Sequence, residues 1–277
     1  MKEENKAALI TGASSGIGRA LAEVMAEKGY HLLLVGRRPD RLEALRSAIA
    51  QKTNRTVVTM SCDVRNADQM AGEIQKSVRL LGRLDVAVAN AGYTIAGSFE
   101  NLNTGDYKNI FDTNFFGMLN TLYPALPHLK KSGGTVIVVG SILGELGILD
   151  RSAYVATKFA MRGFYESVRY ELKEKGISFL FVEPGFVSTE LRHMDKTGKR
   201  ISHVTEQSKK ATSHGIAVSP ESVARQIVRC MPGRLKYRKR VITGHGKVFV
   251  FLNRLCPGFL AAFIYRNRDY IRKYIVK

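Results

Sequence analysis

The sequence of 277 residues contains only three cysteines, Cys62, Cys230 and Cys256. No two of them form a Cys-x-x-Cys pair, which argues against a cysteine-based metal site. An odd and sparse count favours buried thiols in a reducing compartment over a disulfide framework. The N-terminus is charged and leads directly into an apolar strand, without the apolar stretch and cleavage site of a signal peptide. We therefore expect a cytoplasmic protein.

Acidic residues are scarce in the last part of the chain. The formal net charge is +19, and residues 222–277 contribute +13 of it with a single acid, Asp269. Residues 1–221 are close to balanced at +6. The basic excess is therefore a local property of the C-terminus and needs a local explanation.

Short apolar runs alternate with segments of helical period over most of the chain. The predicted strands are Ala7–Thr11, His31–Val35, Thr56–Cys62, Leu84–Ala89, Thr135–Gly140 and Ser178–Glu183. The predicted helices are Gly16–Lys28, Pro39–Gln51, Ala67–Leu80, Thr104–Lys130 and Arg151–Lys175. Apolar strands separated by helices indicate an α/β fold with a doubly wound parallel sheet, the Rossmann fold. We predict one such domain over residues 1–246 and a helical C-terminal extension over residues 247–277.

A glycine-rich loop, Thr11–Gly18, joins the first predicted strand to the first predicted helix. Gly12 permits the turn, and Gly16 and Gly18 let the backbone approach a pyrophosphate at the helix N-terminus. The spacing is Gly-x-x-x-Gly-x-Gly, which differs from the Gly-x-Gly-x-x-Gly of many dinucleotide enzymes. The residues that we expect to bind a dinucleotide here are Gly12, Ser14, Ser15, Gly16, Ile17 and Gly18.

An acid is missing where the second predicted strand ends. A carboxylate there would bind the ribose 2′-hydroxyl of NAD. The chain has Arg37 and Arg38 instead. Two guanidinium groups suit a 2′-phosphate, so we expect NADP(H) as the cofactor. The alternative is that one arginine only begins the next helix.

Tyr154 and Lys158 lie four residues apart in a predicted helix, with Ser141 thirteen residues before the tyrosine. Residues at this spacing share one helix face, so both side chains can point into one pocket. An ammonium group beside a phenol favours the phenolate and lowers the phenol pKa. The pair therefore indicates a proton donor and acceptor.

These motifs together resemble the short-chain dehydrogenase/reductase family over about residues 6–245. The matching residues are the loop Thr11–Gly18, Cys62-Asp63-Val64, Asn90-Ala91-Gly92, the set Asn114, Ser141, Tyr154 and Lys158, and Pro184-Gly185 with Val187 and Thr189. The resemblance implies that Asp63 and Val64 lie by the adenine, that Asn90, Ala91 and Gly92 follow the fourth strand, and that the last group flanks the nicotinamide.

The resemblance also implies roles for four catalytic residues. Ser141 would bind the substrate carbonyl, and Tyr154 would protonate its oxygen as hydride arrives from the nicotinamide. Lys158 would lower the tyrosine pKa and bind the nicotinamide ribose, and Asn114 would hold a water that relays protons. The structural alternatives are a strand-end cap for Ser141 and a polar position within a helix for Asn114.

The polar stretch at residues 188–219 lacks a strong apolar period. We interpret it as a substrate loop or lid, because ligands of such sheets bind after strand ends; a disordered excursion is the alternative. Its histidines His193, His203 and His214 have no recognised metal-ligand spacing, so we expect no metal.

The C-terminal extension combines an apolar run, Val248–Ile264, with basic flanks. The run is too short and too interrupted for a membrane span, and it is typical of a segment that lies in an anionic membrane interface. A helix buried against the fold or against a second subunit is the alternative, which would make the protein a homo-oligomer. No nucleic-acid-binding module accompanies the charge, and we expect no nucleic acid.

Our leading hypothesis is an NADPH-dependent reductase of a hydrophobic, lipid-like ketone at a membrane surface. By analogy, the extension is similar to that of family members such as 3-ketosphinganine reductases. The alternatives are a steroid or retinoid dehydrogenase, a soluble 3-oxoacyl reductase, or a non-catalytic NADP-binding regulatory protein.

Overall fold

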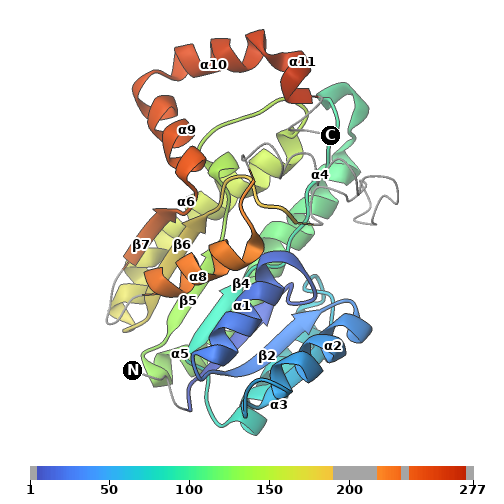
Figure 1. The fold of residues 1–277 in the computed structure, drawn as a ribbon, viewed down its shortest axis with the longest axis vertical. Helices are drawn as coiled ribbons and strands as arrows, with labels where there is room; N and C mark the ends of the chain where they lie inside the picture. The colour runs from blue at the N-terminus through green and yellow to red at the C-terminus, as the bar shows by residue number, and fades with distance from the viewer. Residues whose placement is uncertain (1–4, 190–216, 232–236, 273–277) are drawn as a thin grey trace.

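The computed structural model describes residues 5–189, 217–231 and 237–272, and these form a single seven-stranded sheet in which all neighbouring strands are parallel. The strand order is β3-β2-β1-β4-β5-β6-β7 (Figure 1). The strands are β1 (Ala7–Thr11), β2 (His31–Gly36), β3 (Val57–Ser61), β4 (Val86–Ala89), β5 (Thr135–Val139), β6 (Ser178–Glu183) and β7 (Tyr237–Val241). The predicted doubly wound parallel sheet is confirmed.

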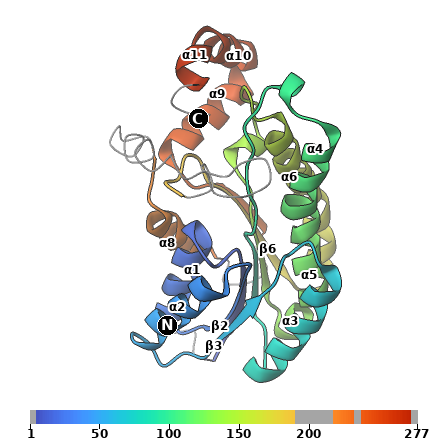
Figure 2. The same ribbon diagram turned by 90° about the vertical axis from the view of Figure 1, so that its right-hand side faces the viewer.

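Helices cover both faces of the sheet, which is why β1, β5 and β6 are buried along their whole length. One layer contains α1 (Gly16–Glu27), α2 (Pro39–Ala50) and α8 (Pro220–Cys230); the other contains α3 (Ala67–Leu81), α4 (Thr104–Phe111), α5 (Gly117–Ser132) and α6 (Ser152–Glu174) (Figure 2). Two separate clusters of buried apolar side chains fill the space between the sheet and these layers.

The helix predicted over Thr104–Lys130 is interrupted. α4 ends at Phe111, a π-helical segment follows over Asp112–Phe116, and α5 continues from Gly117. The amide of Asn114, in the middle of the π-helical segment, bonds the backbone of Tyr93 beyond the end of β4. Such widened turns within helices occur frequently at functional sites. The apolar period alone gave no indication of the interruption.

The end of the domain also differs from the prediction. The six predicted strands are followed by a seventh, β7 at Tyr237–Val241. The helix α8 was not predicted, although Ser219 caps it by accepting a hydrogen bond from the backbone of Ser222 and Pro220 occupies its first turn. Of the predicted lid, residues 190–216 lie outside the described residues, and so do its three histidines. Next to that gap, Val187 and Val218 form a parallel bridge.

The C-terminal extension is helical over its described part, as predicted. It forms α9 (Gly244–Leu255), α10 (Pro257–Arg266) and the short α11 (Arg268–Ile271), which together extend from one end of the molecule (Figure 1). α9 begins at Gly244, shortly before the expected domain boundary at residue 246. None of the described helices is by itself long and apolar enough to cross a membrane. α9 and α10 together reach the required length and composition, but they meet at an angle of 120°.

Candidate active site

A cavity of about 410 Å³ opens where the strands of the sheet end. It collects residues from the loops that follow β1, β2, β4, β5 and β6, which is the edge where doubly wound sheets bind ligands. Nearly every residue predicted for the site lines it; the exceptions are Gly18 and Asn114. Segments far apart in the sequence therefore meet in one place.

The loop after β1 is built for close backbone approach. Gly12 and Gly16 have φ angles of +68° and +55°, which favour glycine. A side chain at Gly12 would come within 2.9 Å of Ala91 Cα and Asn90 Nδ2. Gly18 lies outside the cavity because its Cα faces the carbonyl of Gly12, so it packs the helix against the loop. This arrangement fits the pyrophosphate of a dinucleotide at the N-terminus of α1.

Asn90 supports the glycine loop from the neighbouring strand. Its Nδ2 atom donates a hydrogen bond of 2.9 Å to the carbonyl oxygen of Thr11. In return, the Thr11 hydroxyl oxygen accepts hydrogen bonds from the backbone N–H groups of Asn90 and Ala91, at 3.1 and 3.2 Å. The side chain of Asn90 is thus part of the frame that holds the loop in place.

Two arginines and no carboxylate stand at the end of β2. Arg38 Nη2 donates to the hydroxyl oxygens of Ser14 at 3.0 Å and Ser15 at 2.9 Å, and Arg37 is exposed at the cavity rim. Asp63, which follows β3, lines the same part of the cavity. Burial acts to raise the pKa of its carboxyl group, but hydrogen bonds from Arg65 and the charge of Arg37 outweigh burial and lower this pKa overall. The end of the cavity beside β2 therefore carries two cations, Arg37 and Arg38, and one carboxylate, Asp63.

Tyr154 and Lys158 both lie on α6 and both reach the cavity, as their spacing predicted. Lys158 Nζ is 5.5 Å from the centroid of the Tyr154 ring and donates a hydrogen bond of 3.1 Å to the carbonyl oxygen of Val139. Ser141 lines the cavity from the end of β5, and its hydroxyl oxygen accepts a hydrogen bond from the backbone of Leu143. The three side chains converge from two elements.

Burial controls the acidity of this pair. It raises the pKa of the Tyr154 phenol, while Ser141 and the charge of Arg151 act to lower it. Burial also lowers the pKa of Lys158 to about 8. The expectation that the lysine would set the tyrosine below its ordinary pKa is not met here, because the ammonium group points to Val139 and desolvation of the phenol dominates.

Asn114 is fully buried beside the cavity. Its Oδ1 atom accepts a hydrogen bond from the backbone N–H of Tyr93 at 2.9 Å. Its Nδ2 atom donates to the carbonyl oxygen of Tyr93 at 3.0 Å and to the Thr157 hydroxyl oxygen at 3.1 Å. Both amide hydrogens are therefore engaged by protein groups. The predicted role in holding a water stays a prediction.

Several lining residues were not predicted. Arg151 is buried, lines the cavity and donates from Nη1 to the Thr94 hydroxyl oxygen at 2.9 Å. It precedes Tyr154 by three residues, so helical spacing could have indicated it. Leu143, Ile148 and Phe186 add an apolar wall. Leu143 lies in a single 3-10 turn and the other two lie in loops, where sequence patterns carry little information on position. The described residues contain no cluster of three or more metal-ligating side chains.

A parallel sheet with a glycine loop after β1 and a Tyr–Lys pair at its edge defines a class of dinucleotide-dependent enzymes. Residues 6–200 match the family described as short chain dehydrogenase. The chain belongs to this family.

Among curated proteins, the chain is 37% identical over 187 residues to the 11-beta-hydroxysteroid dehydrogenase-like 2 of Arabidopsis thaliana, which covers 67% of this chain and 60% of that protein. It is 34% identical over 201 residues to the retinol dehydrogenase 8 of Homo sapiens, covering 71% of this chain and 62% of that protein. The matches thus span less than two thirds of the length of these relatives.

Solved structures share the fold over more of the chain. An alcohol dehydrogenase from Thermococcus sibiricus, complexed with 5-hydroxy-NADP, has a TM-score of 0.71 and 28% identity, covering 86% of this chain and 97% of that one. A short chain dehydrogenase from Mycobacterium paratuberculosis, bound to NAD, has a TM-score of 0.75 and 25% identity, covering 89% and 100%. Both nicotinamide cofactors occur among the neighbours, so the comparisons support a nicotinamide cofactor without selecting one.

Proposed function

We propose that this protein is an NADP(H)-dependent oxidoreductase that interconverts a hydrophobic carbonyl compound and its alcohol. One observation carries the proposal: Ser141, Tyr154 and Lys158 line the same cavity as the glycine loop at Gly12–Ile17. The bound cofactor would supply or accept the hydride. The chain's own residues would bind the carbonyl and move its proton.

The proton is assigned to Tyr154. Because burial raises its pKa, the phenol is protonated at neutral pH and suited to donate to a carbonyl oxygen in the direction of reduction. The Ser141 hydroxyl would hold the same oxygen, and Lys158 would bind the ribose beside the nicotinamide. Asn114 would maintain the backbone of Tyr93 at the cavity wall. The segment with Pro184, Gly185, Val187 and Thr189 would flank the nicotinamide.

The preference for NADP(H) is supported by Arg37 and Arg38. The Arg38 guanidinium is held at the cavity by Ser14 and Ser15, and no carboxylate at the end of β2 competes for a ribose hydroxyl. A 2′-phosphate carries the charge that this end of the cavity favours.

The substrate that we propose is a lipid-like ketone or alcohol, because Leu143, Ile148 and Phe186 make the substrate side apolar. A long-chain ketone such as 3-ketosphinganine is one candidate. A steroid or a retinoid is the second, and the names of the relatives from Arabidopsis thaliana and Homo sapiens favour it.

Turnover separates these candidates. Purified protein would be assayed for NADPH oxidation with 3-ketosphinganine, with straight-chain methyl ketones of increasing length, with a ketosteroid and with retinal. We expect turnover to rise with apolar size, and the preferred compound identifies the class. Equal and negligible oxidation with every ketone, at saturating NADPH, would contradict the proposed activity.

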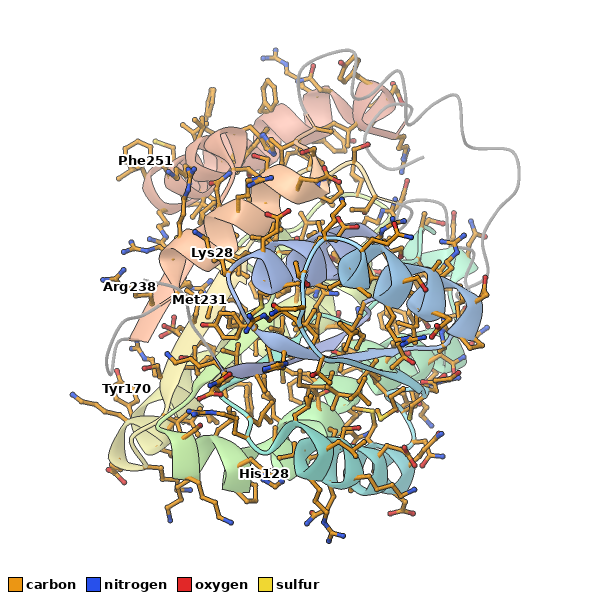
Figure 3. The ribbon with its side chains drawn as sticks, turned by 60° about the horizontal axis from the view of Figure 1, so that its bottom comes forward. Lys28, His128, Tyr170, Met231, Arg238 and Phe251 are labelled. Carbon is orange, nitrogen blue, oxygen red and sulfur yellow. The ribbon has the colours of Figure 1, made fainter. Side chains whose placement is uncertain are left out.

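We further propose that the protein works on a membrane surface, to which the tail helices α9 and α10 would bind. On α9, Val248, Phe251 and Leu255 are 58%, 60% and 63% exposed and share one face by their spacing. Phe259 and Phe263 are exposed in the same way on α10. Phe251 lies at the outside of the molecule, away from the sheet (Figure 3). Lys247 on α9 and Arg266 on α10 are also exposed, and their positive charge suits anionic lipid.

Flotation with liposomes tests the membrane proposal. The full chain should float with vesicles that contain phosphatidylserine, and the variant Phe251→Ser/Phe259→Ser should remain in the bottom fraction. Leu80→Ser/Phe99→Ser is the matched control, because both of these residues are also exposed but lie outside the tail. Equal flotation of both variants would remove the tail as the binding surface. A stable dimer that dissociates only in Phe251→Ser/Phe259→Ser would assign the same face to a second subunit.

A further inference from the structure

The helical tail, α9 to α11, contacts the segments that line or flank the cavity at three separate places. The first contact is at its beginning, where His245 Nε2 accepts a hydrogen bond of 2.8 Å from the backbone N–H of Phe186 and the two rings stack 5.4 Å apart. The Thr243 hydroxyl oxygen accepts from the backbone N–H of Gly185 at 3.1 Å. Gly185 and Phe186 both line the cavity. The start of the tail therefore holds the wall that follows β6.

The second contact is at Glu145, in the segment between β5 and α6. Its side chain is 3% exposed and pairs with Lys239 of β7, with Arg162 of α6 at 2.9 Å and with Arg254 of α9 at 3.3 Å. Asn253 of α9 donates a hydrogen bond of 2.8 Å to the carbonyl oxygen of Glu145. The last turn of α9 is therefore joined to Glu145, midway between β5 and α6.

The third contact is at Asp150, where the same segment ends. Arg272 Nε, directly after α11, lies 2.9 Å from Asp150 Oδ2. Asp150 has a φ angle of +55°, in the left-handed region that aspartate and asparagine adopt more readily than most residues. Its carbonyl oxygen accepts a hydrogen bond of 3.0 Å from the backbone N–H of Gly97. Asp150 is thus a defined corner, held by the tail on one side and by the chain after β4 on the other.

The segment between these two contacts contributes one residue to the cavity and ends beside another. Ile148 lines the cavity, and Arg151, the residue after the corner, lines it too. α6 starts at Ser152, so Tyr154 lies in the first turn after the corner. A displacement of Asp150 would change the positions of Ile148 and Arg151 directly. The body of α6, with Lys158, is held by its own packing and would move less.

We propose that the tail positions the substrate wall of the cavity, and that Arg272 is a positioning residue that acts on this wall through Asp150. The tail contacts Glu145 through Arg254 and Asp150 through Arg272, at the two ends of the segment that carries Ile148 to the cavity. Releasing the distal end lets the corner move while the fold and the Tyr–Lys pair persist. The positioning of the wall by the tail does not depend on the reaction, whereas the expected change in KM rests on the proposed reductase activity.

Hydrogen exchange, followed by mass spectrometry on peptides that cover residues 145–151, tests the positioning without any substrate. In Arg272→Ala, we expect exchange in this segment to accelerate about twofold to fivefold, the scale of a partly exposed ion pair. Arg272→Lys keeps the cation and should restore much of the protection. Arg268→Ala is the control: this arginine also belongs to α11, but its guanidinium stacks over Tyr265, 5.1 Å away.

Steady-state kinetics test the effect of this positioning on substrate binding, measured with the ketone that gives the highest turnover. Arg272→Ala should raise KM about twofold to fivefold and change kcat little, because the reacting groups stay in place. Asp150→Asn keeps a side chain that tolerates the left-handed backbone and removes the charge. Both substitutions remove the same Arg272–Asp150 ion pair. The KM of the double variant should therefore be no higher than that of either single variant.

The outcomes separate the two proposals. Unchanged exchange and unchanged KM in Arg272→Ala, or equal changes in Arg268→Ala, would overturn the positioning role, as would additive effects of the two single substitutions. Accelerated exchange in a protein that reduces no ketone would support the positioning role and contradict the proposed activity instead.

Discussion

Arg38 connects the end of β2 to the glycine loop, because its Nη2 atom donates hydrogen bonds to the hydroxyl oxygens of Ser14 at 3.0 Å and Ser15 at 2.9 Å. The glycine loop therefore holds the Arg38 guanidinium in place at the cavity, although the two segments are distant in the sequence. A carboxylate at this position would bind a ribose hydroxyl, whereas the proposed preference for NADP(H) requires the Arg38 guanidinium to bind a 2′-phosphate.

Removing this guanidinium should separate the two cofactors. Arg38→Ala should weaken NADPH binding roughly 10- to 100-fold, as expected for the loss of hydrogen bonds to a charged group, and NADH binding should change little. Arg37→Asp should shift the preference further toward NADH. The fluorescence of the reduced nicotinamide, titrated with protein, measures both affinities. The chain contains no tryptophan to interfere.

Arg46→Ala is the control for that titration, because Arg46 lies on the exposed side of α2 and pairs with Glu43. It should bind both cofactors as the unaltered protein does. An equal loss of NADPH and NADH affinity in Arg38→Ala would show that Arg38 supports the loop only, and the 2′-phosphate site would lie elsewhere.

Glu183 makes stability depend on pH. Burial and the neighbouring Glu145 raise its pKa to about 7, while Lys239 and Arg162 act to lower it. The folded state then binds a proton more tightly than the unfolded state between pH 4.5 and 7. The free energy of unfolding should fall as pH rises through this window, because the unfolded state releases this proton freely whereas the folded state must retain it or bury a charged carboxylate.

Glu183→Gln removes this titration and keeps a neutral side chain of similar shape. Urea unfolding at the two ends of the window should show that the unaltered protein loses stability relative to Glu183→Gln as pH rises. Glu171 is exposed on α6, and Glu171→Gln should show the same dependence of the free energy of unfolding on pH as the unaltered protein. If the free energy of unfolding of Glu183→Gln also followed the same pH dependence as that of the unaltered protein, Glu183 would be ionised in the folded protein over the whole window.

Asn114 should contribute to stability as well as to the site. Asn114→Ala would leave the backbone N–H and carbonyl oxygen of Tyr93 without their buried partners, at a cost of about 2–4 kcal/mol in the free energy of unfolding. Urea unfolding measures the loss. Asn109→Ala, an exposed position on α4, should change the free energy of unfolding very little. A loss of activity without a loss of stability in Asn114→Ala would favour the water-relay role instead.

The sequence could predict the parts of the site that depend on local spacing. The loop at Gly12–Gly18 lies where a strand meets a helix, and Tyr154 and Lys158 share a helix face. Both patterns are local, and all the predicted residues of these two groups except Gly18 line the cavity. The doubly wound parallel sheet follows from alternating apolar segments joined by right-handed crossovers. These features need no knowledge of distant contacts.

Other features depend on contacts between distant residues. The π-helical segment at Asp112–Phe116 contains Asn114, whose partner Tyr93 is 21 residues away in sequence. The pKa of Tyr154 depends on how deeply the fold buries it, and helical spacing indicates only that Lys158 is near. The tail was predicted from composition, but its attachment at Glu145 and Asp150 is a property of the folded chain.

The central claim is that Tyr154 transfers the proton in a hydride-transfer reaction, and Tyr154→Phe tests it most directly. Steady-state NADPH oxidation with the preferred ketone should fall by about 100-fold or more, while NADPH affinity stays close to that of the unaltered protein. Tyr170→Phe, at an exposed tyrosine on the same helix, is the matched control and should retain full turnover. Unchanged turnover in Tyr154→Phe would contradict the account.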